Sequence, residues 1–138
     1  MAPPFRHRQK IRFRDTDCQG HVFNANYFAY FDDAVTDFLE VRGVPYPLVT
    51  ERGHDMVLVR AECDFRSSAV LGEELEIRVR VERFGRTSMT FVLEATEVGS
   101  GRTVAEGREV YVVLDRTTGR SCPVPEYLKD ALAADRPA

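Results

Sequence analysis

The sequence predicts an α+β domain in which a five-stranded antiparallel sheet wraps around a long central helix. Between Tyr27 and Phe38, aromatic and aliphatic side chains recur at helical spacing and leave little of the helix circumference polar. Residues 74–84 instead alternate apolar and charged side chains with a period of two, which is typical of a strand with one buried face. A helix this apolar needs a concave cover, and a curled sheet supplies one.

Alternating segments define the expected strands. They cover residues 8–14, 56–65, 74–84, 88–98 and 103–114. Glycine-containing links of hairpin length at residues 72–73, 85–86 and 99–101 favour antiparallel pairing between consecutive strands. A short helix or turn is expected at residues 44–53, which contain two prolines, and a short C-terminal helix at residues 125–134, which begin with a proline.

The central helix is expected to start near Asn24 to Asn26. Asn24 is a plausible N-cap and Asn26 is a second candidate, because asparagine side chains accept hydrogen bonds from the free N–H groups of a helix start. Gly43, followed by Pro45, ends the helix. In the last strand, Gly107 marks either a bulge or a close approach of the helix.

Composition limits the class of protein. The chain has 138 residues, read as one domain over residues 1–138, with 43% hydrophobic and 30% charged residues, which is ordinary for a globular protein. A net charge of −3 leaves no excess of positive charge to neutralise phosphates, so no nucleic acid is expected as a partner. Three widely spaced cysteines indicate a reducing compartment. With no membrane-length apolar run and no apolar core of a secretion signal, a cytoplasmic protein is expected.

A polar turn joins the first strand to the helix, and its residues carry a family resemblance. The residues concerned are Asp15, Asp17, Gly20, His21, Val22, Asn24 and Tyr27. In this pattern the stretch from about Ile11 to Phe38 resembles the hotdog-fold acyl-CoA thioesterases of the 4-hydroxybenzoyl-coenzyme A thioesterase family, and a weaker likeness extends to about Val113. The resemblance implies the hotdog fold, a homodimer with joined sheets and active sites at its interface, and commonly a homotetramer. Phe23, which precedes Asn24, departs from some relatives, so the acyl pocket is expected to differ.

The resemblance also implies roles for two residues. The Asp17 carboxylate would attack the thioester carbonyl or activate water, and the backbone N–H of Asn24 would hold the carbonyl oxygen. A helix start suits an oxyanion, because it presents unpaired N–H groups and the positive end of the helix dipole. Gly20 lets the backbone approach the substrate without an intervening side chain. A carboxylate in the same turn can serve as nucleophile or as general base, and the sequence leaves both open.

Structural roles compete with these chemical ones. Asp17 can also be the acceptor of an Asx turn. His21 can be a general acid, a hydrogen-bonding partner of the substrate or a packed polar residue. Cys18 and His21 have the spacing of half a metal site, but Cys63 and Cys122 lack partner spacing, so no metal is expected.

Substrate contacts are expected from aromatic and basic residues. Phe23 and Tyr27 lie nearest the turn and are candidates for the acyl group. Arg66 and Arg86 are candidates for the nucleotide phosphates of coenzyme A, although arginines in turns are usually solvated, and no glycine-rich phosphate loop is present. Coenzyme A would enter as part of the substrate, and no separate cofactor is expected.

Together these features predict an acyl-CoA thioesterase that hydrolyses a small-molecule thioester to a free acid and a thiol. One alternative is a thioesterase for acyl carrier protein, since the basic residues of segment 6–14 suit an acidic carrier as well as phosphates. A second is a hydratase or dehydratase on the same fold, with Asp17 and His21 as acid and base. The third is a non-catalytic acyl-binding protein.

Overall fold

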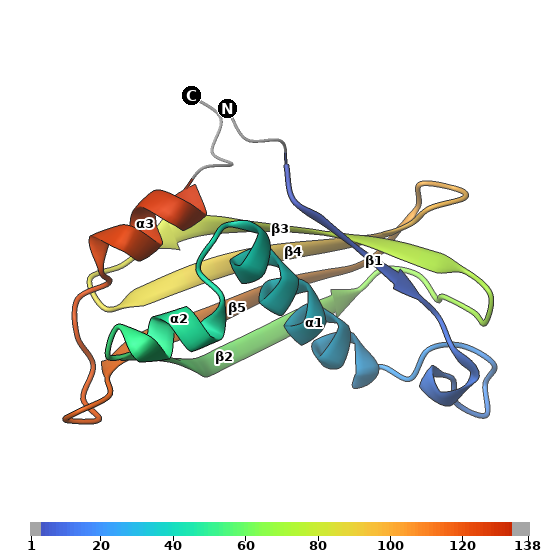
Figure 1. The fold of residues 1–138 in the computed structure, drawn as a ribbon. Coiled ribbons are helices and arrows are strands. Elements are labelled where there is room, and N and C mark those ends of the chain that lie inside the picture. The colour runs from blue at the N-terminus through green and yellow to red at the C-terminus, as the bar shows by residue number, and fades with distance from the viewer. Residues whose placement is uncertain (1–3, 134–138) are drawn as a thin grey trace.

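A computed structural model describes residues 4–133 (Figure 1). In chain order the elements are β1 (Arg6–Lys10), the 3-10 helix η1 (Phe13–Asp15), α1 (Asn26–Val41), α2 (Tyr46–Glu51), β2 (His54–Phe65), β3 (Glu74–Phe84), β4 (Ser88–Glu97), β5 (Thr103–Asp115) and α3 (Glu126–Leu132). Within this part of the chain the strands form one five-stranded antiparallel sheet in the order β1-β3-β4-β5-β2. None of the helices described is long and apolar enough to cross a membrane.

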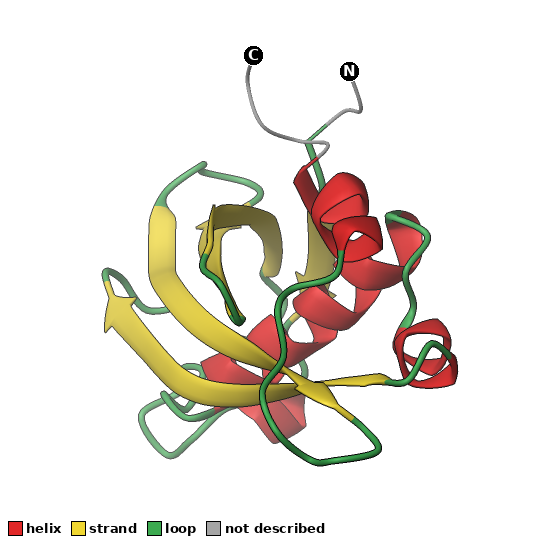
Figure 2. Ribbon diagram, turned by 90° about the vertical axis from the view of Figure 1, so that its left-hand side faces the viewer, coloured by secondary structure: helices red, strands yellow, loops and turns green. Residues whose placement is uncertain are grey.

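Helix α1 packs on one face of the sheet, which curves around that side of the helix (Figure 2). It has 16 residues and is therefore about 24 Å long. Phe31 and Phe38, on its buried side, have no exposed surface, and the Phe38 ring centroid lies 6.1 Å from that of Phe91 on β4. Phe31 lies so close to Gly107 on β5 that a β-carbon there would overlap the ring. Gly107 thus marks a close approach of the helix, one of the two expected alternatives.

Strands β3, β4 and β5 follow the alternating pattern of the sequence closely. β3 has the predicted bounds, β4 ends one residue earlier, and β5 ends one residue later. On each strand, buried side chains alternate with more exposed ones, because one face packs against α1 and the other meets solvent. The short helices α2 and α3 lie in the two expected segments, and residue 134 is outside the described residues.

The first strand is shorter than predicted. Instead of covering residues 8–14, β1 ends at Lys10, and η1 follows. The carboxylate of Asp15 accepts a hydrogen bond from the backbone N–H of Arg12 at 2.9 Å, and the Thr16 hydroxyl donates to the Phe13 carbonyl at 2.8 Å. These side chains satisfy backbone groups locally, which favours a tight turn over continued pairing.

The predicted hairpin at residues 72–73 is wrong. β2 pairs with β5 and not with β3, which lies between β1 and β4. Residues 66–73 form a crossover between the two strands, and their backbone contacts lie elsewhere: Arg66 N–H donates to Val104 at 2.8 Å, and Val22 N–H donates to Ala69 at 2.8 Å. The crossover therefore joins β5 to the polar turn before α1.

Edge strand β2 also departs from the expected alternation. Regular alternation over residues 56–65 would put Val57 and Val59 on the apolar face of the strand. These side chains are instead 40% and 58% exposed, whereas Met56 and Cys63 pack against the core. Met56 and Cys63 are out of phase with each other because the pairing with β5 shifts register between Leu58 and Arg60. A bulge of this kind moves the inward positions from even to odd residue numbers.

Candidate active site

The polar turn before α1 is closed by backbone hydrogen bonds. Asp17 N–H donates to the His21 carbonyl at 3.0 Å, and Gly20 N–H donates to the Asp17 carbonyl at 3.0 Å. A bridge between Thr16 and Val22 continues the pairing. Gly20 has a φ of 85°, a left-handed conformation that residues with side chains rarely adopt, so the turn requires glycine here.

Within this turn the half-buried Asp17 side chain has an observed structural role. Its Oδ1 accepts a hydrogen bond from the Gln19 backbone N–H at 2.9 Å, which is the contact of an Asx turn. Among residues 4–133, Oδ2 has no hydrogen-bond or ion-pair partner. One carboxylate oxygen thus holds the turn while the other stays available to a ligand.

The start of α1 differs in detail from the expected cap. Asn26 is the first helical residue and Ala25 is the cap, so the prediction of Asn24 or Asn26 as N-cap is wrong, and no side chain caps the helix. The Asn26 amide group instead donates to the Asp15 carbonyl at 2.8 Å, which fixes the turn to the helix. The N–H groups of residues 26–28 already bond to the carbonyls of residues 23–25.

Two backbone donors remain at this helix start. Within the described part of the chain, the N–H groups of Asn24 and Ala25 have no acceptor, and both residues are exposed. These unpaired donors therefore lie just before α1, where an oxyanion site is expected from the sequence, next to the turn that holds Asp17.

A cleft of about 230 Å³ opens beside these amides. Its walls are formed by His21, Val22, Asn24, Tyr27, Phe65, Arg66, Ser67 and Ser68. The structure thus brings Arg66 next to His21, Asn24 and Tyr27, although about 40 residues separate it from them in the sequence. Asp17 is not part of the wall of this cleft but is joined to it through the backbone of His21.

Three wall residues were not expected from the sequence. Phe65 packs its ring against Tyr27, with centroids 5.6 Å apart, and Ser67 and Ser68 follow on the crossover. Burial raises the pKa of the Tyr27 hydroxyl to about 12, so this side chain stays neutral at physiological pH. The sequence gives no sign that these residues reach the site, because only the end of β2 and the crossover that follows it bring them next to the polar turn and α1.

The remaining candidates lie outside the cleft. Phe23 is 53% exposed beside it. Arg86 lies in the turn between β3 and β4, at the opposite end of the sheet, where its carbonyl accepts the N–H of Val124 at 2.9 Å (Figure 1). Arg66, which does line the cleft, is held loosely by Asp64 at 3.5 Å and Glu106 at 3.6 Å. No group of three His, Cys, Asp or Glu side chains among residues 4–133 is arranged to hold a metal ion.

Comparisons with known proteins identify the family. The family model described as the thioesterase-like superfamily matches residues 11–132. A putative esterase from Aquifex aeolicus is 34% identical over 88 residues, which are 64% of this chain and 69% of that protein. A 1,4-dihydroxy-2-naphthoyl-CoA hydrolase from Synechococcus elongatus is 26% identical over 130 residues, which are 93% of this chain and 94% of the relative.

A solved structure of a gentisyl-coenzyme A thioesterase has a TM-score of 0.80 and 26% identity, covering 94% of this chain and 99% of that one. The names of these relatives agree with the thioester hydrolase predicted from the sequence, and the resemblance to hotdog thioesterases is confirmed. With the model match extending over most of its length, the chain belongs to the thioesterase-like superfamily.

Proposed function

We propose that this protein hydrolyses acyl thioesters of coenzyme A, with Asp17 as nucleophile or general base and the Asn24 N–H as oxyanion donor. The observation that carries the proposal is the pair of unpaired amides, at Asn24 and Ala25, in the turn that also holds a carboxylate with one free oxygen. The superfamily and the names of its members support the reaction type.

The chemistry follows from these groups. A thioester carbonyl placed at the start of α1 would receive hydrogen bonds from amides whose dipoles favour negative charge. The Asp17 carboxylate would then attack the carbonyl carbon and expel the thiolate, and water would hydrolyse the resulting acyl anhydride to the free acid and Asp17. Alternatively, Asp17 would remove a proton from a water that attacks the carbonyl carbon and expels the thiolate. Loss of one oxyanion donor typically costs about 10²–10³ in rate, so the backbone geometry at Asn24 matters nearly as much as the acid.

We propose an aromatic acyl thioester as the substrate. Two relatives that match most of this chain are named for aromatic acyl groups, dihydroxynaphthoyl and gentisyl. Aromatic side chains lie around the candidate cleft, with Tyr27 and Phe65 in its wall and Phe23 exposed beside it. Arg66 offers a positive charge to the phosphates of the nucleotide. An acyl carrier protein in place of coenzyme A is the alternative carrier.

A homodimer is the proposed functional unit. β2 is an edge strand of the sheet, so its outer backbone groups are unpaired in one chain. Its Val57, Leu58 and Val59 side chains are 40–58% exposed, which is unusual for three consecutive apolar residues of a strand. Pairing of β2 with a second copy would continue the sheet, with α1 as the central helix of each subunit. The homotetramer and the cytoplasmic location stay predictions.

The test is hydrolysis of a panel of aromatic and aliphatic acyl-coenzyme A esters, followed by release of free thiol, for the parent and Asp17→Asn. Asparagine keeps the side-chain oxygen that accepts from Gln19, so the turn should persist while the acid is lost. The expected loss in kcat is at least about 10³-fold. Asp33→Asn, on the exposed face of α1, is the matched control and should keep full activity.

Equal thiol release by the parent and Asp17→Asn would refute the role of Asp17. The same panel separates the alternatives, because a hydratase would change the absorbance of an enoyl thioester without releasing thiol. Binding without any turnover would indicate a non-catalytic acyl-binding protein.

A further inference from the structure

One wall of the cleft is a crossover that is held largely by contacts to other segments. Residues 66–73 connect β2 to β3, and Ser67 and Ser68 line the cleft. Between Ser68 and Val70 the crossover contacts the polar turn, where the Ala69 carbonyl accepts the N–H of Val22 at 2.8 Å and Val70 bridges to His21. Val22 is two residues before Asn24, so any shift of the crossover displaces the proposed oxyanion donor.

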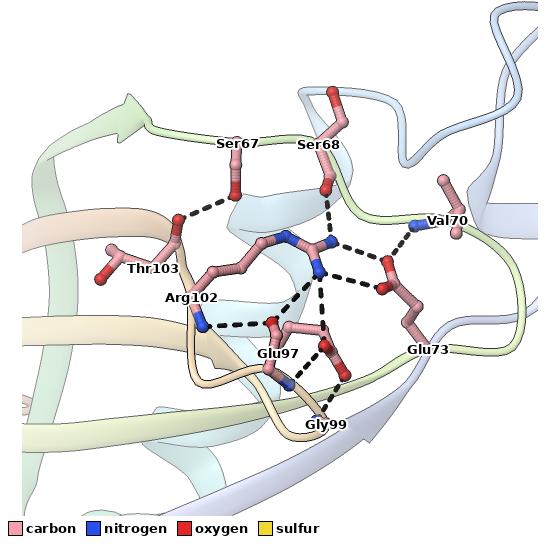
Figure 3. A network of polar contacts seen from close by, with 9 residues as sticks. Ser67, Ser68, Val70, Glu73, Glu97, Gly99, Arg102 and Thr103 are labelled. Carbon is pink, nitrogen blue, oxygen red and sulfur yellow. Dashed lines mark hydrogen bonds and ion pairs between the residues drawn. The ribbon is translucent and has the colours of Figure 1, made fainter.

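Arg102 lies in the turn between β4 and β5, and its guanidinium makes hydrogen bonds to this crossover (Figure 3). Its Nη2 donates to the Ser68 carbonyl at 2.7 Å and to Glu73 Oε1 at 2.8 Å, and its Nη1 donates to Glu73 Oε2 at 3.1 Å. Glu73 Oε1 in turn accepts the N–H of Val70 at 2.9 Å. One side chain therefore holds the backbone on both sides of Ala69.

A second carboxylate anchors the guanidinium itself. Glu97 Oε1 lies 3.3 Å from Arg102 Nη1, while the same carboxylate accepts the N–H groups of Gly99 at 2.6 Å and Ser100 at 2.9 Å (Figure 3). Hydrogen bonding to Arg102 lowers the pKa of the Glu73 carboxyl, and hydrogen bonds from the Gly99 and Ser100 region lower that of Glu97. Both carboxyl groups therefore stay charged at neutral pH. Arg102, Glu73 and Glu97, called the clamp below, include a bidentate ion pair between Arg102 and Glu73.

We infer that Arg102 is a positioning residue for the reaction, which sets the place of the Asn24 amide through Ser68, Ala69 and Val22. The inference rests on the proposed function, because a rigid cleft wall matters only if the Asn24 amide takes part in the reaction. Arg102 does not line the cleft. Its effect is on the geometry of the oxyanion donor and therefore on kcat more than on KM.

Lysine is the decisive substitution because it keeps the charge but cannot reproduce the planar fork that holds Ser68 and Glu73 together. In Arg102→Lys we expect kcat to fall about 10- to 100-fold with KM changed less than about threefold. Arg108→Lys is the control, since Arg108 is an exposed arginine of β5 with a contact of 3.0 Å to Glu82, and its kcat should match the parent.

A second measurement, hydrogen exchange, reports on the clamp without depending on activity. Hydrogen exchange of the Val22 and Val70 amides, measured by NMR, should become at least about tenfold faster in Arg102→Lys, because the acceptors of both N–H groups lose their support. Exchange in the central strand β4 should not change. Arg102→Gln serves as a second, neutral variant, and both are assayed well below their unfolding temperatures so that only folded protein contributes.

The outcomes separate the two proposals. If the parent releases no thiol from any ester, the proposed function fails, while the exchange of Val22 still tests the clamp. If the parent is active and Arg102→Lys keeps its kcat, the positioning role is refuted, even where the unfolding temperature falls. Unchanged exchange at Val22 in both variants would refute it as well.

Discussion

Replacing Glu109 with glutamine should raise the free energy of unfolding relative to that of the parent as the pH increases. Glu109 shares the buried face of β5 with Gly107 and Tyr111, is 2% exposed, and has an Oε1 without a hydrogen-bond partner among the described residues. Burial raises the pKa of its carboxyl to about 7, and the nearby charge of Asp32 on α1 adds to the effect. The other titratable groups coupled to it are Tyr111 and, on β2, Cys63, whose own pKa values burial also raises.

The magnitude follows from the two pKa values of Glu109. The folded chain keeps the proton up to about pH 7, whereas the unfolded chain releases it near the ordinary value of 4.5. Because the folded-state pKa is raised, stability falls as the pH rises through this interval and stops falling above it. Each pH unit in the interval costs about 1.4 kcal/mol, so the full loss is about 3 kcal/mol. Glutamine cannot ionise and escapes this loss.

Urea unfolding at about pH 5 and about pH 8 measures the effect. The free energy of unfolding of Glu109→Gln, relative to the parent, should rise by about 2 kcal/mol or more between the two conditions. A buried amide donor without a partner costs the variant about 1–3 kcal/mol at both pH values, so the change with pH is the quantity to compare. Glu94→Gln, an exposed glutamate of β4, is the control and should show no such change. An equal difference at both pH values would refute the reasoning.

Two further substitutions test the packing and the assembly. Gly107→Ala should lower the free energy of urea unfolding by about 1–3 kcal/mol, because its β-carbon would overlap the Phe31 ring, and a change below about 0.5 kcal/mol would contradict the close approach of α1. Leu58→Lys on edge strand β2 should shift the sedimentation coefficient from dimer to monomer and reduce thiol release, since a charge there opposes sheet pairing. Val98→Lys, at a similarly exposed apolar residue outside β2, should stay dimeric, and a parent that sediments as a monomer would remove the proposed dimer.

The strands could be predicted wherever their pattern is set by one buried face. β3 matches its predicted bounds because Leu75, Ile77, Val79 and Val81 all point to the core with charged residues between them. The span of β2 was predicted to within two residues. Its partner and its inward-facing residues could not be predicted, since its pairing with β5 is a long-range contact and its bulge reverses the alternation. Whether two successive strands are neighbours depends on where the link between them finds hydrogen bonds, and residues 66–73 find theirs at Val104 and at the polar turn.

The candidate site also has one part that could be predicted from the sequence and one that could not. The turn with Asp17, Gly20 and Asn24 could be located from the sequence because its residues are neighbours in the chain. The opposite wall, with Phe65 and Ser68, could not be located, since it reaches the turn only through the crossover and its hydrogen bond with Arg102. Sequence spacing therefore indicated the candidate groups of the turn but not the structure that holds them.

Asp17 shows why a local pattern does not separate structure from chemistry. An Asx turn and a thioester hydrolase both need a short side chain with a carbonyl-type oxygen at this position, and one carboxylate can serve both because its two oxygens are independent acceptors. The turn uses Oδ1, and its geometry would be satisfied equally by asparagine. A chain selected only for the turn would tolerate either residue, whereas the proposed reaction requires the negative charge on the other oxygen. A folded Asp17→Asn protein therefore separates the two roles, because it keeps the turn and removes only the charge.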